Sequence, residues 1–247
     1  MEIPPVSIII PTLNEETYLP LLLGSLARID APMEVIVVDA HSDDRTLEVA
    51  QSFSDRFGGV SSLQVLLAPT RGVAAQRNFG AKRASHDILL FLDADVIVPS
   101  PEAYRVLISR FCARGYVVAT ALSRPIGIDV RASFIYATQI IFQSAMLMFG
   151  RALFSGACML VRKETFERVG GFDTALRVAE DNEFSERAGK AGRRGLIAVR
   201  VPVSSRRLKK DGYSRTYAKW LMGGLLAVFK RSQMAQSIPY TFGEFGD

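Results

Sequence analysis

The sequence has 247 residues, of which 49% are hydrophobic and 22% are charged. This composition is typical of a globular chain with one large domain or two small ones, and it argues against intrinsic disorder. The two cysteines, Cys112 and Cys158, are too few for a disulfide framework and lie in no CxxC or histidine cluster, so structural zinc is not expected.

The formal net charge of +5 suits an anionic partner, but the sign does not choose among phosphates, nucleic acid and an anionic membrane surface. The sequence contains no basic RNA-binding motif and no C2H2 spacing, so nucleic acid is not expected as a partner. The N-terminal sequence MEIPPVSIIIPT lacks the positively charged start of a signal peptide. We therefore expect a cytoplasmic chain, and we leave open an association with the inner face of the membrane.

The first half of the chain alternates between strand-like and helix-like segments. Short apolar runs predict strands at residues 6–10, 33–39, 63–68 and 88–92. Helices are predicted between them at residues 18–27, 46–53 and 72–84. This order implies right-handed crossovers and a mostly parallel α/β sheet with helices on both faces.

The second half is less regular. Strands are predicted at residues 117–121 and 157–161, and helices within residues 162–173 and 180–191. Residues 133–150, SFIYATQIIFQSAMLMFG, are strongly apolar but include Gln139 and Gln143. The apolar core of this segment is shorter than the roughly 20 residues needed to cross a bilayer, so it predicts a buried or interfacial helix.

Polar residues follow each of the first four predicted strands. They are Pro11, Thr12, Asn14 and Glu15 after the first strand; Asp39 and Ser42 after the second; Arg71, Gly72, Arg77 and Asn78 after the third; and Asp93, Ala94 and Asp95 after the fourth. In a doubly wound sheet these strand ends lie on one rim, where ligands bind. Each of the first three clusters could instead serve only as a turn and an N-cap, so the coincidence of four clusters carries the argument.

These motifs, together with AEDNEFSER at residues 179–187, resemble the family 2 glycosyltransferases in the same order along about three quarters of the chain. The resemblance implies the GT-A fold, in which a Rossmann-like nucleotide-binding sheet merges with a smaller mixed region. It suggests a nucleotide-sugar-binding half at residues 1–98 and an acceptor-binding half at residues 99–205. Residues 206–247 would then form a C-terminal basic loop and an apolar helix.

The resemblance also implies roles for the donor-side residues. Pro11, Thr12, Asn14 and Glu15 would hold the nucleoside, and Asp39 would accept from the N–H edge of the base. Arg71 and Arg77 would lie near the diphosphate, because a guanidinium can pair two phosphate oxygens at once. The remaining donor-binding candidates are Ser42, Gly72, Asn78, Asp93 and Ala94. The expected donor is a nucleotide-diphosphate sugar.

For the metal and the acceptor, the resemblance implies a second set of residues. Asp95, with Asp93 either behind it or on the ribose, would hold Mg²⁺ or Mn²⁺ against the diphosphate, since these hard cations take oxygen ligands. Asp181 would be the general base for the acceptor hydroxyl, with Glu180 orienting the acceptor or the base. Gly156 and Arg187 are acceptor-side candidates. The alternative for Glu180 and Asp181 is that they only favour the N-terminus of a helix through its dipole.

The sequence departs from the family pattern at several positions. Asp39 is followed by Ala40 and His41 where many members have an acid and a glycine, which puts base and ribose recognition in doubt. Arg71 stands where the family often has asparagine. No histidine follows His86, so no C-terminal histidine can bind the metal, and water or phosphate must complete its ligand shell.

The C-terminal basic run and the apolar residues 217–229 allow two interpretations. They are either a mobile lid on the diphosphate with a membrane-surface or dimer-forming helix, or a solvated loop with a packed helix. Peripheral membrane contact, a lipid-linked acceptor and a homodimer stay open.

Three functions remain as alternatives: an inverting transferase, a polyprenyl-phosphate glycosyl synthase, and a non-catalytic nucleotide-sugar binder. A sugar-nucleotidyltransferase is disfavoured because PTLNEE is not a glycine-rich phosphate loop.

Overall fold

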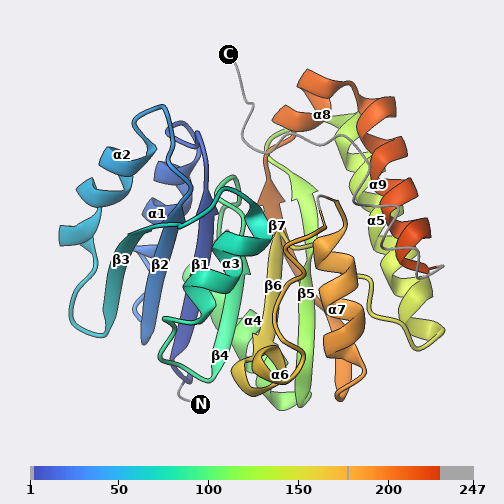
Figure 1. Ribbon diagram of the computed structural model, residues 1–247, viewed down its shortest axis with the longest axis horizontal. Coiled ribbons are helices and arrows are strands. Elements are labelled where there is room, and N and C mark those ends of the chain that lie inside the picture. The colour runs from blue at the N-terminus through green and yellow to red at the C-terminus, as the bar shows by residue number, and fades with distance from the viewer. Residues whose placement is uncertain (1–2, 177, 229–247) are drawn as a thin grey trace.

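A computed structural model describes residues 3–176 and 178–228 of the chain. Its centre is a seven-stranded sheet with the order β3-β2-β1-β4-β6-β5-β7 (Figure 1). The strands are β1 (Val6–Thr12), β2 (Met33–Asp39), β3 (Ser61–Leu67), β4 (Ile88–Leu92), β5 (Tyr116–Pro125), β6 (Cys158–Arg162) and β7 (Arg193–Val203). The first four run parallel, as the alternation of elements predicts.

Helices cover both faces of this sheet (Figure 1). They are α1 (Leu19–Leu26), α2 (Thr46–Ser52), α3 (Val73–Ala81), α4 (Pro101–Ala113), α5 (Val130–Met148), α6 (Lys163–Arg168), α7 (Glu180–Gly189), α8 (Arg206–Asp211) and α9 (Tyr213–Val228), with a 3₁₀ turn at Ser54–Arg56. Within the described ranges, no helix combines the length and the apolar character needed to cross a bilayer.

The continuous apolar strands β1, β2 and β4 are buried on both faces, as expected for central strands of a covered sheet. Alternate side chains of β1 enter two separate cores. Ile8 and Ile10 pack in one core, and Ile9 packs in the other. The parallel register pairs Thr12 with Asp39, so the polar residues after β1 and β2 lie at the same edge.

Strand β6 is antiparallel to both of its neighbours, β4 and β5. It pairs Cys158 with Leu92, and the backbone N–H of Asp93 donates to the carbonyl of Ala157 at 3.1 Å. The start of β6 therefore lies beside the end of β4. This reversal brings Gly156 close to the acids that follow β4.

The structure corrects three expectations for the second half. Helix α4 and strand β7 are absent from the sequence-based prediction, and the basic run at Arg206–Asp211 forms helix α8 rather than a loop. In β7 the burial alternates along much of the strand, and the exposed positions are Arg193, Ala198 and Arg200, so the apolar signal is diluted. The N-terminus of α4 carries a recognisable signal: the Ser100 side chain accepts from the N–H of Ala103 at 3.1 Å, and Pro101 follows it.

The predicted C-terminal apolar helix is present as α9. The rest of the predicted C-terminal region, residues 229–247, lies outside the described residues.

Candidate active site

A cavity of about 250 Å³ opens at the carboxyl ends of β1 and β4. One part of its wall is acidic and comes from the loops after the strands and from α7. The other part comes from α5 and α9 and is aromatic, apolar and uncharged polar. The predicted site residues that line it are Pro11, Glu15, Arg77, Asp93, Ala94, Asp95, Gly156, Glu180 and Asp181. Residues far apart in the chain thus share one cavity.

Arg77 on α3 is the central cation of this site. Its guanidinium is almost fully buried and donates to Asp93 Oδ1 at 2.7 Å and to Glu180 Oε1 at 3.1 Å. It also lies over the Phe172 ring, 5.2 Å from the ring centre. Arg77 therefore links the acids after β4 to the acids that begin α7.

Gly156 makes room for this arginine. A Cβ atom at position 156 would lie 2.6 Å from Nη2 of Arg77, which is closer than van der Waals contact allows. The backbone N–H of Gly156 also donates to Asp181 Oδ2 at 2.7 Å. The loop before β6 thus positions both Arg77 and Asp181.

Glu180 and Asp181 begin α7 directly after Ala179, which adopts a left-handed conformation with φ of 61°. Burial and the neighbouring Asp181 raise the pKa of Glu180 to about 7, although Arg77 opposes the shift. Burial also raises the pKa of Asp181, against the effect of Arg77 and of the hydrogen bond from Gly156. A raised pKa makes each of these two adjacent carboxylates a better proton acceptor.

Glu15 and Asp95 form a second acidic group, and Arg206 of α8 lies between them. Arg206 donates to Glu15 Oε1, and its Nε is 3.8 Å from Asp95 Oδ2. Burial raises the pKa of Glu15 to about 8 and that of Asp95 to about 6, because the opposing effect of Arg206 is smaller. Arg206 is a site residue that the sequence-based analysis assigned only to a basic run, since no local pattern pairs it with Glu15.

These carboxylates suit a hard divalent cation. Within the part of the chain that is described, the buried Glu15 Oε2 has no hydrogen-bond partner. After burial, neighbouring carboxylates also raise these pKa values against the effect of Arg206: Asp95 and Asp93 act on Glu15, and Asp93 acts on Asp95. A divalent cation among them would favour the ionised carboxylates. The described residues contain no cluster of three or more His, Cys, Asp or Glu arranged as a metal cage, so substrate oxygens would have to supply further ligands.

The predicted site residues at the ends of β1 and β2 and just after them form hydrogen bonds with one another and with their neighbours. Asn14, with φ of 56°, receives a hydrogen bond at Oδ1 from the N–H of Asp43 at 2.9 Å and donates its own N–H to Ser42 Oγ at 3.0 Å. Asp39 accepts from Thr12 Oγ1 at 3.1 Å and from the Ser42 N–H at 2.9 Å. Thr12, Asn14, Asp39 and Ser42 do not line the cavity but fix the shape of its rim.

Gln76 is a further residue that the sequence-based analysis missed. It is fully buried, and its amide donates to the carbonyls of Thr12 at 2.8 Å and Val38 at 2.7 Å. This holds the ends of β1 and β2 together under the rim. The sequence signal that could have identified Gln76 is its position directly before Arg77, in the segment after β3.

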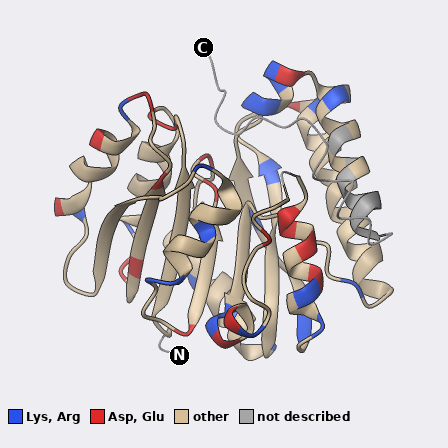
Figure 2. Ribbon diagram, in the orientation of Figure 1, with Lys and Arg blue, Asp and Glu red and all other residues tan. Residues whose placement is uncertain are grey.

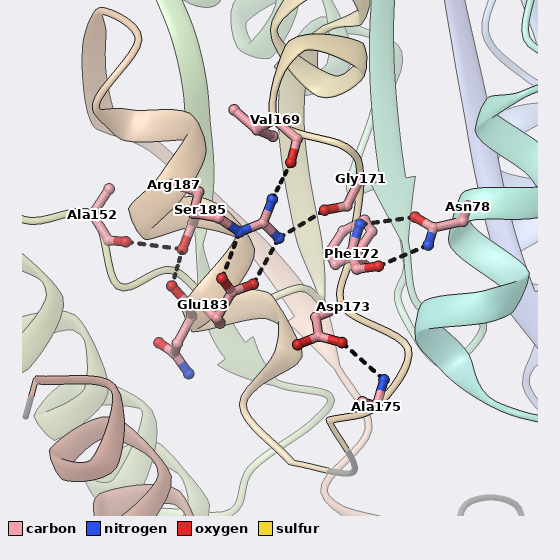
Figure 3. Close-up of polar contacts among 11 residues, drawn as sticks. Asn78, Ala152, Val169, Gly171, Phe172, Asp173, Ala175, Glu183, Ser185 and Arg187 are labelled. Atoms are coloured by element: carbon pink, nitrogen blue, oxygen red, sulfur yellow. Dashed lines mark hydrogen bonds and ion pairs between the residues drawn. The ribbon is translucent and has the colours of Figure 1, made fainter. Parts of the chain in front are cut away.

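Four other predicted residues lie outside the cavity. Arg71 and Gly72 precede α3, where Arg71 is exposed and donates to the carbonyl of His41 at 2.8 Å. Asn78 exchanges two hydrogen bonds of 2.8 Å with the backbone of Phe172 (Figure 3). Arg187 pairs with Glu183 and donates to the carbonyl of Gly171 at 2.7 Å (Figure 3). The geometry gives Asn78 and Arg187 a role in holding the loop before α7.

Comparison of the sequence with known proteins identifies the family. The family model of glycosyl transferase family 2 matches residues 7–170, well over half of the chain. An uncharacterized glycosyltransferase of Haemophilus influenzae is 31% identical over 186 residues, which cover 72% of this chain and 60% of that protein. The chain therefore spans less than two thirds of this relative.

Solved structures share the fold. The mannosyltransferase PcManGT from Pyrobaculum calidifontis, in complex with GDP-Man and Mn²⁺, superposes with a TM-score of 0.74 at 21% identity over 97% of this chain and 67% of that one. Residues 1–349 of TarS from Staphylococcus aureus, in complex with UDP, give a TM-score of 0.62 at 22% identity over 85% and 63% of the two chains. With this GT-A fold and the match over residues 7–170, the chain belongs to the family 2 glycosyltransferases.

Proposed function

We propose that this glycosyltransferase moves a sugar from a nucleotide-diphosphate donor to an acceptor hydroxyl, with a divalent cation and with inversion at the anomeric carbon. The observation that carries the proposal is the meeting of Glu15, Asp93 and Asp95 with Glu180 and Asp181 in one cavity. The solved neighbours with UDP and with GDP-Man and Mn²⁺ support a donor of this class.

Asp95 and Asp93 are the residues proposed to hold Mg²⁺ or Mn²⁺ against the diphosphate, and water or phosphate oxygens complete the shell. Such a cation supplies Lewis-acid stabilisation of the negative charge on the leaving diphosphate. Arg77 keeps Asp93 in place through its buried ion pair. Pro11 and Glu15 line the same cavity and are the residues proposed to hold the nucleoside.

In the proposed reaction, the acceptor oxygen attacks the anomeric carbon from the face opposite the diphosphate. The bond between that carbon and the phosphate oxygen breaks, and its electron pair leaves with the nucleoside diphosphate. The acceptor proton passes to Asp181, whose carboxylate is oriented by the N–H groups of Gly156 and Asn182. Glu180, held by Arg77, orients the acceptor or the base.

The donor is tested by thermal shift with UDP, GDP, dTDP and CDP, each with and without Mn²⁺. We expect one nucleotide to raise the melting temperature, and to do so more in the presence of Mn²⁺. Stabilisation by a ligand increases with the ratio of its concentration to its dissociation constant, and Mn²⁺ should lower that constant. Asp95→Asn should remove the metal-dependent part, while Asp43→Asn at an exposed position should keep it. Equal shifts with and without Mn²⁺ would contradict the assignment of Asp95.

Catalysis is tested with Asp181→Asn. Turnover of the donor that the thermal shift identifies should fall by about 10²- to 10⁴-fold, the usual contribution of a general base, while the nucleotide shift is retained. Unchanged turnover would instead favour the alternative function, a polyprenyl-phosphate glycosyl synthase, because its anionic acceptor needs no base.

A further inference from the structure

The outer face of α5 carries an apolar stripe that the proposed reaction does not use. The stripe consists of the apolar residues Val130, Phe134, Ala137, Ile141 and Met148, with the small Ser144 in line with them, and all six are exposed. The exposed fractions of Val130, Phe134, Ile141 and Met148 are 78%, 68%, 67% and 87%. The spacing alternates between four and three residues, so these side chains share one face of the helix.

The opposite face of α5 combines apolar side chains with Gln139 and Gln143, which line the cavity. Ile135 and Tyr136 are buried in the core, and Tyr136 and Phe142 line the cavity. Arg131 is the single charged residue in the sequence of α5. An amphipathic surface helix presents mostly charged and polar side chains to solvent, whereas α5 presents one charge, Arg131, and a row of apolar side chains. Exposed apolar surface that is continuous along a helix marks an interaction site.

Basic residues gather at the end of the helix where the stripe begins. Asp129, the N-cap of α5, accepts from Tyr213 at 2.8 Å and from Ser205 at 3.1 Å, so the start of α5 lies against α8 and α9. Figure 2 shows Lys and Arg on α8 at this end of the α5–α9 pair. Lys209 and Lys210 of α8 and Arg131 of α5 are exposed there.

We propose that the α5 stripe and this basic end dock the protein on an anionic lipid surface. An apolar helix face beside lysines and arginines is the pattern that binds the boundary between acyl chains and anionic head groups. A second copy of the chain fits less well. A helix of this length extends for roughly 28 Å and is roughly 10 Å wide, so one face of it offers roughly 300 Å², well below the roughly 800 Å² per partner of a stable interface.

The test is co-sedimentation of the full chain with vesicles of phosphatidylcholine alone and of phosphatidylcholine with three parts in ten phosphatidylglycerol. We expect binding to the anionic vesicles, and binding roughly tenfold weaker or more for Phe134→Ser/Ile141→Ser. The matched control is Leu21→Ser/Val60→Ser, which changes apolar side chains that are 48% and 56% exposed on other elements. The control should bind as the unchanged protein does.

Charge reversal tests the electrostatic part. Lys209→Glu/Lys210→Glu should weaken binding to anionic vesicles several-fold, whereas Lys82→Glu/Lys190→Glu, at exposed positions elsewhere, should change it little. Unchanged melting temperatures and nucleotide shifts establish that each variant is folded and binds its donor, so a failure of docking is separate from a failure of the proposed function. The proposal is overturned if the unchanged protein does not co-sediment with the anionic vesicles. It is equally overturned if Phe134→Ser/Ile141→Ser alters only a monomer–dimer equilibrium in light scattering.

Discussion

At the scale of single residues, Arg77 is the cation whose removal the site tolerates least. It is 3% exposed and pairs with both Asp93 and Glu180. Arg77→Met keeps much of the side-chain volume but leaves two acids without their counter-charge. We expect the free energy of unfolding to fall by about 3 kcal/mol, near the low end for broken buried pairs because Asp93 is 37% exposed. Urea unfolding measures this.

The control for this prediction is Arg71→Met. Arg71 is 56% exposed and its ion pair with Asp43 lies at the surface, so its loss should change stability by only about 0.5 kcal/mol or less. Similar losses for Arg71→Met and Arg77→Met would show that the buried bridge contributes nothing specific.

Glu15 makes the stability of the protein depend on pH. The ordinary pKa of a glutamate is 4.5, and burial, as the main cause, raises the pKa of Glu15 to about 8 in the folded protein. The folded state therefore holds a proton between these values that the unfolded state releases, and stability from this group is lost as pH rises from 4.5 towards 8. Glu15→Gln, which carries no titratable proton, should flatten this decline in chemical unfolding measured across that range.

Burial also raises the pKa of Asp95 to about 6 and that of Glu180 to about 7, so these groups titrate in the same range and the comparison must be between variants. Glu34 has a lowered pKa, because hydrogen bonds from Ser7 and Ser85 outweigh its desolvation, and its contribution is lost in the opposite direction, as pH falls. Glu34→Gln should leave the decline towards alkaline pH intact. An equally steep decline for Glu15→Gln and the unchanged protein would refute the role of Glu15.

At the scale of elements, the start of α7 stores backbone strain beside the acids. Ala179 has φ of 61°, a left-handed conformation that costs a residue with a Cβ roughly 1 kcal/mol. Ala179→Gly should therefore raise the free energy of unfolding by roughly 0.5 to 1 kcal/mol. The same change at the exposed Ala137, within α5, should lower it by about 1 kcal/mol. A lower free energy of unfolding for Ala179→Gly would contradict the proposal that the backbone is strained at this position.

The elements also show what the sequence could and could not predict. Strands β1, β2 and β4 are continuous apolar runs, so their positions and their parallel order follow from local pattern. Strand β7 escaped prediction because it begins with Arg193, Arg194 and Gly195 and its apolar part is interrupted by Arg200. Helix α8 is only six residues long and mostly basic, and it forms where Ser205 and Leu208 pack against the rest of the fold.

At the scale of the whole molecule, the sequence predicted which strand ends meet but not which side chains face the cavity. Asp95, Glu180 and Asp181 line it as the motifs suggested, whereas Asp39, Asn78 and Arg187 are engaged by neighbouring residues. The difference depends on contacts between segments far apart in the chain, such as Asn78 with Phe172, which are separated by 94 positions. Such contacts follow from the antiparallel β6 and from the loop before α7, and neither has a local signature.

A residue from the C-terminal part of the chain completes one wall of the site. Arg206 follows β7 and donates a hydrogen bond to Glu15, which follows β1. Its guanidinium, stacked 4.6 Å from the centre of the Tyr18 ring, supplies positive charge beside Asp95. A divalent cation at Asp95 would compete with that charge. Arg206→Gln should therefore strengthen Mn²⁺ binding in the absence of nucleotide, because the acids lose a competing counter-charge.

Electron paramagnetic resonance of free Mn²⁺ during a titration measures this affinity without relying on activity. We expect at least a several-fold lower dissociation constant for Arg206→Gln, and no change for Arg45→Gln, where the arginine is 77% exposed and pairs with Glu16. Arg206→Gln/Asp95→Asn should lose the gain if the metal binds at Asp95. Weaker Mn²⁺ binding by Arg206→Gln would mean that the arginine organises the carboxylates for the cation instead of competing with it.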